Sequence, residues 1–290
     1  MTIQQLASQV KSKLEKDGTM TTNQPKSVDA TTIAQLMTTN QPKSVDATTI
    51  AQLKALGFSD VQMDIPRRLI ASVSGKEKTG KTHFCLTAPA PIVFFNIDLG
   101  TEGVVEKFQA GFGGQPPKQV LINNIRIPKG AKQDIYATMW RELWQKVETA
   151  YKLHTGTIVL DTSTEAYEMC RLAHFGKLTQ VMPHQYAVVN NDWREFMRMA
   201  YDSTANTLLI HKVKPKYVNN VRTNEYEISG MSEIPYLVQA NLTTFRDDSS
   251  GEQTFGITII DCRQNPVLSG TVLRGPTCNF DFVLGLVHDN

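Results

Sequence analysis

The pattern of apolar and polar positions divides the chain into two regions near residue 65. From Arg67 onward, short apolar runs alternate with longer stretches in which apolar residues recur every three to four positions. The short runs predict strands and the longer stretches predict helices, and their alternation is typical of a mostly parallel α/β sheet. We therefore expect residues 1–65 to form a helical and linker region and residues 66–290 to form one α/β domain.

The predicted elements follow from the length and spacing of these runs. The predicted strands are Leu69–Ser74, Ile92–Ile97, Val120–Ile127, Thr157–Leu160 and Thr207–His211, followed by an antiparallel hairpin of Leu237–Arg246 and Thr254–Cys262. The predicted helices are a short one that ends at Ala88, then Ile135–Leu153, Glu165–Phe175, Gln185–Tyr201 and a closing helix, Phe280–Val287. We expect Thr207–His211 to be the last parallel strand.

The N-terminal region holds an identical tandem repeat. The 17 residues MTTNQPKSVDATTIAQL occupy positions 20–36 and recur at 37–53. Two short identical copies do not make a solenoid, which needs about three longer units. In the second copy Asp46 can cap a helix that Gly57 ends, whereas the first copy predicts a polar linker. Met1–Gly18 predicts an amphipathic helix and not a signal peptide.

Composition and charge exclude several classes of protein to which this chain could belong. Hydrophobic residues make up 41% of the chain and 18 residues are glycine, which excludes wholesale disorder and collagen. The net charge of +2 neither requires nor excludes a polyanionic partner. Four cysteines lie far apart without a Cys-x-x-Cys pair, so we expect free thiols in a reducing compartment, the cytoplasm. No apolar segment is long enough to predict a membrane span.

The eight residues that directly follow the first predicted strand match the P-loop pattern. They are Gly75, Lys76, Glu77, Lys78, Thr79, Gly80, Lys81 and Thr82, and with His83 they form the predicted nucleotide-binding set. The glycines allow backbone N–H groups to converge on phosphate oxygens, and the start of the next helix adds its positive dipole end. We expect Lys81 to reach the β- and γ-phosphates of ATP and the Thr82 hydroxyl to bind Mg²⁺.

A nucleotide site of this kind also needs acidic groups opposite the P-loop. Asp161 ends the apolar strand Thr157–Leu160, and we predict that it completes the magnesium site. A water-activating acid should stand near the γ-phosphate without binding the metal. Asp98 and Glu102 follow the second strand, and we favour Glu102; its alternative is a solvated glutamate at a helix start. Asp98 either supports the site or caps its strand.

These motifs resemble the RecA-like branch of P-loop ATPases, and most closely the phage-encoded RecA-like proteins associated with single-strand annealing. The residues that carry the resemblance are SGKEKTGKT at Ser74–Thr82, FFNIDLGTEGV at Phe94–Val104, TIVLDTS at Thr157–Ser163 and LLIHKVK at Leu208–Lys214. The resemblance covers Pro66–Val287 and implies a RecA-like fold with a mostly parallel sheet, flanking helices and antiparallel C-terminal strands. It also implies ATP and Mg²⁺ as cofactors, ATP hydrolysis, and assembly into a ring or filament.

The resemblance implies roles for further residues. Gly100 stands near the position at which the family carries its catalytic glutamate, and Glu102 lies two positions on. His211 occupies the position that senses the γ-phosphate, with a packed strand-end histidine as the alternative. Arg263 or Arg274 is a candidate to act on the nucleotide of a neighbouring subunit.

The resemblance also implies a disordered DNA-binding loop after the strand Thr207–His211. The candidate contacts there are Lys212, Lys214, Lys216, Tyr217 and Arg222. The absence of acids from His211 to Asn224 suits phosphates and one stacked base. A solvated hairpin is the equally weighted alternative, because Glu225, Glu227 and Glu233 follow.

Three functions remain open. The first is an ATP-dependent recombination or annealing protein that acts on single-stranded DNA, together with a single-strand-binding protein, in the host cytoplasm if the gene is a phage's. The second is a nucleotide-binding switch without turnover that docks a protein partner, and the third is a small-molecule kinase. The sequence lacks His-Glu-x-x-His, Gly-x-Ser-x-Gly and clustered His and Cys, which argues against metallohydrolase and serine-hydrolase chemistry.

Overall fold

The computed structural model describes residues 46–60, 66–111, 116–153, 156–178, 181–248 and 253–288 of the chain. The chain forms two units, residues 1–63 and 64–290, which we describe separately. The predicted helix within Met1–Gly18, the first repeat copy and the start of the second lie outside the described residues.

The first unit contains one described helix, α3 (Ala47–Ala55). Asp46 caps it as predicted, because its side chain accepts a hydrogen bond from the Thr49 N–H at 2.7 Å. Gly57 adopts the predicted left-handed conformation after the helix, with φ of +97°. None of the residues of α3 is buried.

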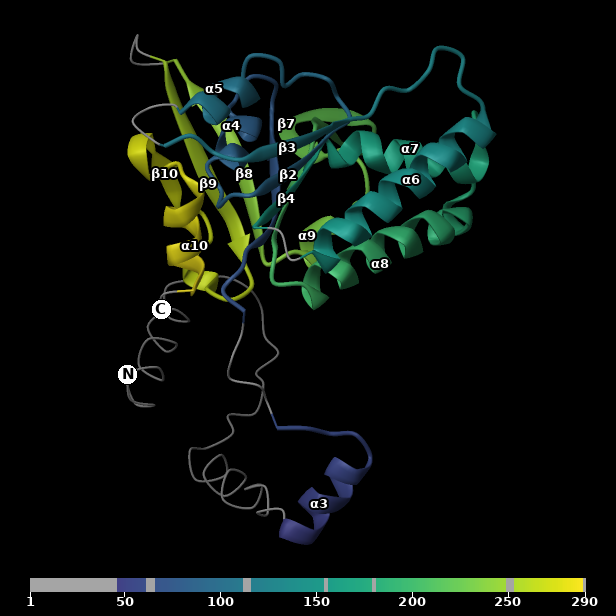
Figure 1. Cartoon of the computed structure of the whole chain (residues 1–290), viewed down its shortest axis with the longest axis vertical. Coiled ribbons are helices and arrows are strands. Elements are labelled where there is room, and N and C mark those ends of the chain that lie inside the picture. Colours follow the sequence, from purple (N-terminus) through teal and green to yellow (C-terminus); the bar gives the residue numbers. More distant parts are fainter. Residues whose placement is uncertain are drawn as a thin grey trace, which may run out of the picture. The chain divides into compact units, whose positions relative to one another are not determined.

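The second unit is built on an eight-stranded sheet with the order β10-β9-β8-β1-β5-β4-β2-β3, accompanied by a two-stranded sheet β6-β7 (Figure 1). The strands are β1 (Ile70–Gly75), β2 (Ile92–Asn96), β3 (Val120–Asn124), β4 (Thr157–Asp161), β5 (Asn206–Ile210), β6 (Val213–Val218), β7 (Val221–Ile228), β8 (Ala240–Asp247), β9 (Thr254–Cys262) and β10 (Val272–Arg274). The α-helices are α4 (Lys81–Leu86), α5 (Val105–Ala110), α6 (Gln133–Lys152), α7 (Ser163–Phe175), α8 (Ala187–Asp202), α9 (Ile234–Leu237) and α10 (Phe280–His288). The mostly parallel sheet with antiparallel C-terminal strands confirms the predicted fold class.

The prediction for the last parallel strand was wrong. Strand β8 pairs in parallel with β1, in the register Ala71↔Ala240, so it follows β5 as a further parallel strand. It also pairs with β9 as the predicted antiparallel hairpin. The hairpin pattern identifies only one neighbour of a strand, whereas the parallel pairing with β1 joins residues far apart in sequence.

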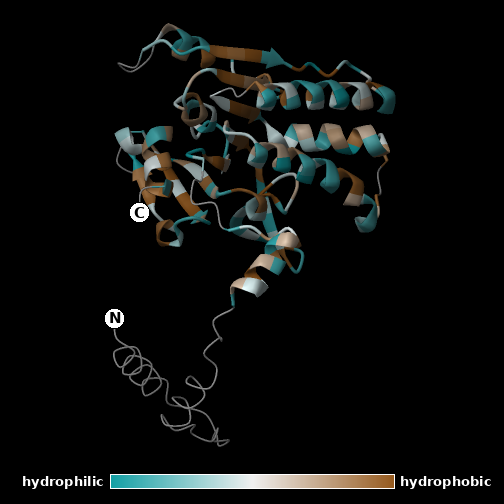
Figure 2. Cartoon of the chain, turned by 60° about the horizontal axis from the view of Figure 1, so that its bottom comes forward, coloured by the Kyte–Doolittle hydropathy of each residue, from teal (hydrophilic) through white to brown (hydrophobic). Residues whose placement is uncertain are grey.

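Helices cover both faces of the sheet. On one face α4, α5 and α10 pack on the alternate residues Leu69, Ala71 and Val73. On the other face α6, α7 and α8 run side by side and enclose Ile70, Trp193 and the inward residues of β4 (Figure 1). Figure 2 shows the result in hydropathy: the strands are largely hydrophobic, whereas the flanking helices alternate between hydrophobic and hydrophilic positions.

The segment after β5 is an ordered hairpin, which corrects the expectation of a disordered loop. Strands β6 and β7 pair antiparallel around Asn219 and Asn220, which both have positive φ. Two residues of this conformation form the turn that suits the twist of a tight hairpin, and Asn tolerates it well. The backbone of this segment is therefore the hairpin that the sequence analysis gave as the alternative. The DNA-binding role of its lysines and Arg222 remains a prediction.

The state of the cysteines and the hydropathy of the helices were also predicted from the sequence. All four cysteines are free. Within the described part of the chain, no helix is long and apolar enough to cross a membrane.

Candidate functional site

The loop between β1 and α4 has a shape that only glycine permits at its two ends. Gly75 has φ of +148°, and a Cβ there would lie 2.5 Å from the backbone oxygen of Thr244 on β8. Gly80 has φ of +92° and caps α4. Between them, the Thr79 hydroxyl donates to the Lys76 carbonyl at 2.8 Å and lies 2.7 Å from the Thr244 hydroxyl. The neighbouring strand β8 thus holds the loop in place.

Lys81, the first residue of α4, folds back into this loop. Its amino group donates to the carbonyl oxygens of Gly75 at 2.9 Å and Lys76 at 2.5 Å. Burial lowers the pKa of Lys81, while the charge of Asp161 acts to raise it. The ammonium group therefore stands at the centre of the loop, where it can transfer its hydrogen bonds to a phosphate.

Thr82 and Asp161 meet across the sheet. One strand, β5, separates β1 from β4, yet the Thr82 hydroxyl donates to Asp161 Oδ2 at 2.8 Å. Asp161 is only 6% exposed, and burial raises its pKa to about 6, although the bond from Thr82 acts to lower it. A hydroxyl and a carboxylate side by side supply the hard oxygens that Mg²⁺ prefers, so these two residues fit a magnesium site.

A cavity of about 350 Å³ opens between Lys81, Thr82 and Asp161, and we call it the phosphate cavity. Its walls are Gly75, Lys76, Glu77, Lys78, Lys81, Thr82, Asp98, Gly100, Asp161, Thr162, Lys212 and Val213. Six of the nine residues of the predicted nucleotide-binding set therefore line one cavity together with Asp161, whereas Thr79, Gly80 and His83 do not line it. The four lysines give it the cationic lining that a polyphosphate needs.

The two candidate water-activating acids differ in position. Asp98 lines the cavity, and its Oδ1 accepts a hydrogen bond from Lys212 Nζ at 2.8 Å. Glu102 is exposed in the turn before α5 and is not among the described residues that line the cavity. The acids that the structure places at the cavity beside Asp161 are thus Asp98 and Glu77.

His83 lies beside a second, larger cavity. This space of about 680 Å³ is reached from the P-loop over Thr79 and Gly80, and Phe255, Arg274 and Cys278 line its far side. The imidazole packs edge-on against Phe108 with ring centres 4.9 Å apart, and burial lowers its pKa. A largely apolar space lined by two phenylalanines, Phe84 and Phe255, and one imidazole, next to the cavity at Lys81, is suited to a nucleobase.

The two candidate arginines lie apart from each other. Arg274 forms an ion pair with Asp247 at 3.1 Å and stacks over Phe245 at the edge of the second cavity. Arg263 follows β9 and contacts the carbonyl of Tyr236 and the hydroxyl of Tyr201. An action of either on a neighbouring subunit stays a prediction.

His211 is buried at the end of β5. It is 1% exposed, and neither ring nitrogen has a hydrogen-bond partner among the described residues. Burial lowers its pKa to about 4, so the ring is neutral near pH 7. It does not line the phosphate cavity, although the next residue, Lys212, does.

The base of the β6–β7 hairpin is tied to the phosphate cavity. Lys212 Nζ donates to Asp98 and also to Glu165 Oε1 at 2.6 Å. Partial burial acts to lower the pKa of Lys212, but these hydrogen bonds outweigh it and the pKa is raised. The Thr164 hydroxyl accepts from the Lys212 N–H at 3.0 Å and donates to the Ser229 carbonyl at 2.8 Å. The helix that follows Asp161 therefore holds both strands of the hairpin.

The remaining predicted DNA-binding residues lie along the hairpin. Lys214 and Lys216 face Glu227 and Glu225 across the strands, at 3.3 Å and 2.8 Å. Tyr217 is 60% exposed, and it is the register partner of Arg222. The acids that follow the loop in sequence thus neutralise part of its charge.

The structure adds contacts that the sequence analysis did not identify. Lys76 of the P-loop lies over the ring of Tyr226 on β7, with 4.4 Å from Nζ to the ring centre. A third cavity, of about 550 Å³, separates this contact from Ser72 of β1 and Asn241 of β8. Tyr226 lies about 150 residues from the P-loop, so no local pattern could have indicated the contact.

A family model matches the part of the chain that contains the P-loop. It is described as an AAA domain and matches residues 67–243, which is more than half of the chain. No curated protein matches the chain significantly. Among solved structures, a KaiC-like protein from the hyperthermophilic archaeon Pyrococcus horikoshii OT3 is similar over 72% of this chain and 89% of that chain, with 10% sequence identity and a TM-score of 0.41.

Proposed function

Because this chain belongs to the family of AAA domains, which are P-loop nucleotide-binding domains, we propose that it binds ATP with Mg²⁺ and hydrolyses it. The observation that carries the proposal is the meeting of Thr82 and Asp161 at 2.8 Å beside the P-loop lysine. A carboxylate that is 6% exposed and next to the P-loop hydroxyl is costly to ionise unless a cation compensates it.

Each group around the cavity has a role in this proposal. The N–H groups of the loop and Lys81 bind the phosphates, and Lys81 exchanges its two carbonyl partners for phosphate oxygens. Thr82 and Asp161 hold Mg²⁺, which when bound neutralises phosphate charge. The base occupies the cavity beside His83 and Phe255.

Water activation needs an acid at the γ-phosphate end of the cavity. Glu102 is the residue that the sequence favours, and Asp98 is the one that lines the cavity. Asp98 is held by Lys212, so a proton accepted there would weaken the contact to the hairpin base. The variants Asp98→Asn and Glu102→Gln show which of the two acids activates the water.

We further propose that the protein acts on single-stranded DNA in recombination or annealing, as the resemblance to phage proteins implies. The hairpin supplies cations and the exposed Tyr217, which suit backbone phosphates and a stacked base. The contacts of Lys212 with Asp98 and of Thr164 with Ser229 support coupling between nucleotide and hairpin. A ring or filament of subunits would align several hairpins along one strand.

A nucleotide switch without turnover is the second candidate. The observation that favours it is the exposed position of Glu102, outside the described cavity lining. A switch would bind ATP and move the hairpin base through Lys212 without releasing phosphate.

The deciding experiment measures phosphate release from Mg-ATP with and without single-stranded DNA. We expect release by the wild type, stimulated by DNA, and a loss of about 100-fold or more in Lys81→Ala. Lys146→Ala, which alters an exposed lysine on α6, is the matched control. Loss in Asp98→Asn with activity in Glu102→Gln assigns Asp98, and the reverse assigns Glu102. Tight ATP binding without release under any condition establishes the switch instead.

A further inference from the structure

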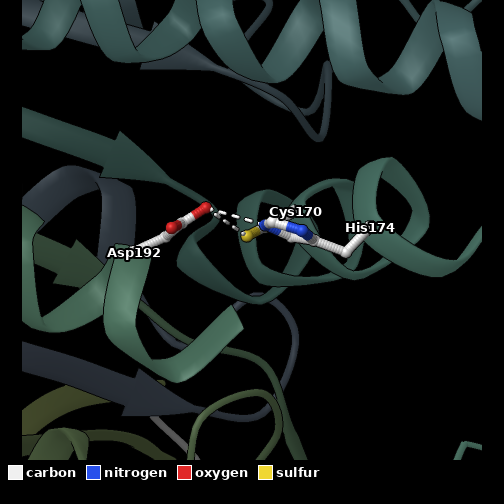
Figure 3. A group of neighbouring side chains, drawn as sticks. All are labelled: Cys170, His174 and Asp192. Atoms are coloured by element: carbon white, nitrogen blue, oxygen red, sulfur yellow. Dashed lines mark hydrogen bonds and ion pairs between the residues drawn. The ribbon is translucent and has the colours of Figure 1, made fainter. Parts of the chain in front are cut away.

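Three side chains of metal-ligating type meet between α7 and α8, on the sheet face that α6, α7 and α8 cover and outside the nucleotide site. They are Cys170 and His174 of α7 and Asp192 of α8 (Figure 3). Asp192 Oδ2 lies 2.9 Å from His174 Nε2 and accepts a hydrogen bond from the Cys170 thiol at 3.5 Å. This corrects the expectation of no clustered His and Cys: Cys170 and His174 share one helix four residues apart, and Asp192 joins them from the next helix.

The local geometry follows from helix periodicity. Cys170 and His174 are four residues apart, so they stand one above the other on the same face of α7. Asp192 reaches them because α8 packs along that face, with Met169 and Trp193 in the shared core. All three potential ligand atoms lie within 4.8 Å of one another.

One of the two distances to Asp192 in the cluster matches an edge of a zinc coordination tetrahedron, and the other is shorter than its edge. Zinc–ligand lengths of about 2.3 Å to sulfur and about 2.0 Å to nitrogen or oxygen place a sulfur about 3.5 Å from an oxygen and a nitrogen about 3.3 Å from one. The Cys170–Asp192 distance is 3.5 Å, and the His174–Asp192 distance is 2.9 Å. An ion can therefore enter after a shift of a few tenths of an ångström in the His174–Asp192 pair.

A supporting shell surrounds the cluster. The Trp140 indole N–H donates to Asp192 Oδ2 at 3.0 Å, as hydrogen bonds commonly orient a ligating carboxylate. The Gln133 side chain donates to the His174 carbonyl at 2.8 Å and anchors the last turn of α7. One carboxylate oxygen thus lies within hydrogen-bond distance of three groups, from Cys170, His174 and Trp140.

The site is accessible from one side. Cys170 is buried, whereas the side chains of His174 and Asp192 are 33% and 32% exposed. A metal ion can enter along the exposed side, and a water molecule can occupy the fourth position.

We propose that Cys170, His174 and Asp192 form a Zn²⁺ site with a water molecule as the fourth ligand. A thiolate with an imidazole selects zinc over Mg²⁺ or Ca²⁺, which take oxygen ligands. Binding displaces the proton of the thiol and ties the last turns of α7 to the start of α8. The proposal does not depend on the proposed ATPase function, because the site shares no residue with the phosphate cavity.

The test uses Co²⁺ as a spectroscopic substitute for zinc. Untagged full-length protein is stripped with a chelator and titrated with Co²⁺ in excess Mg²⁺, which occupies oxygen-only sites. We expect one Co²⁺ per chain, tetrahedral visible absorption, a thiolate-to-cobalt charge-transfer band and displacement by Zn²⁺. His174→Gln and Asp192→Asn should each weaken binding at least about tenfold, and Trp140→Phe about tenfold through the outer shell.

Two controls keep the result interpretable. Cys170→Ser removes the charge-transfer band, but it alters a buried residue, so the exposed His174→Gln variant provides the test that does not depend on core packing. His184→Gln changes an exposed histidine of the neighbouring turn Pro183–Tyr186 and should bind as the wild type does. Absence of the charge-transfer band in the wild type, or equal affinity in His174→Gln and His184→Gln, overturns the proposal and leaves a hydrogen-bonded cluster.

Discussion

Asp161 illustrates how the site depends on single residues. Its carboxyl group is 6% exposed, and burial raises its pKa to about 6 in the absence of a bound cation. The same burial that makes the charge costly strengthens its attraction for a metal ion. Gly75 is a second such residue, because Thr244 occupies the space that any side chain there would need.

The raised pKa of Asp161 predicts a pH-dependent stability difference. Since the folded state holds this proton more tightly than the unfolded chain, the stabilisation is present below the ordinary pKa and is lost as the pH rises through about 6. Relative to Asp161→Asn, the metal-free wild type should lose up to about 3 kcal/mol between pH 4 and pH 7. Urea unfolding of both proteins at several pH values measures this. A constant difference across the range would contradict it.

Gly75→Ala should destabilise the P-loop. The added Cβ would lie 2.5 Å from the Thr244 carbonyl, so a backbone must shift. The control is Gly130→Ala, since Gly130 also has positive φ, +75°, but nothing lies within 4 Å of its Cβ position. We expect Gly75→Ala to lower the free energy of unfolding by about 1–3 kcal/mol more than the control, from overpacking. Equal losses in thermal or urea unfolding would show that backbone strain alone matters.

At the scale of elements, the β6–β7 hairpin has its base at the phosphate cavity, and its strands carry exposed side chains. Its base is held by Lys212 and Thr164, and its strands carry the pair Lys216–Glu225 at 2.8 Å. An exposed pair of this kind contributes little to stability because water solvates both charges. The charges are therefore available for a ligand that offers a better partner than glutamate.

Two hairpin variants should change DNA affinity in opposite directions. Lys216→Ala removes a phosphate contact and should weaken binding to single-stranded DNA while lowering the slope of log affinity against log salt by about 0.7. Glu225→Gln frees Lys216 from its ion pair and should strengthen binding. Fluorescence anisotropy with a labelled oligonucleotide at several salt concentrations measures both. If neither variant differs from the wild type, the hairpin does not bind DNA.

At the scale of the whole molecule, residues 64–290 contain their own hydrophobic core on both faces of the sheet. Because this core lies within the second unit itself, we predict that residues 64–290 fold stably without the first unit.

Truncation tests this independence. A protein of residues 64–290 should unfold cooperatively with a Tm within about 2 °C of that of the full chain, which corresponds to less than about 1 kcal/mol. Circular dichroism melts of the two proteins provide the comparison, and ATP binding confirms an intact P-loop. A fall of about 10 °C would show that the N-terminal unit supports the domain.

The sequence by itself determined the features that rest on local spacing. Residues that are neighbours in sequence determine the P-loop, the strand before Asp161 and the Asp46 cap. The spacing of apolar residues, with its helical or strand period, identified most of the other elements. The two adjacent asparagines, Asn219 and Asn220, are an equally local signal that favours the hairpin, which the sequence analysis had weighed equally with a disordered loop.

Only the tertiary structure decided what depends on long-range packing. The pairing of β1 with β8, the position of Asp98 at the cavity and that of Glu102 outside its described lining, and the contact of Lys76 with Tyr226 join distant segments. The cluster of Cys170, His174 and Asp192 likewise depends on the rotation of α7 against α8. Sequence spacing states which residues share a face of one element, whereas packing of the whole core sets which faces meet.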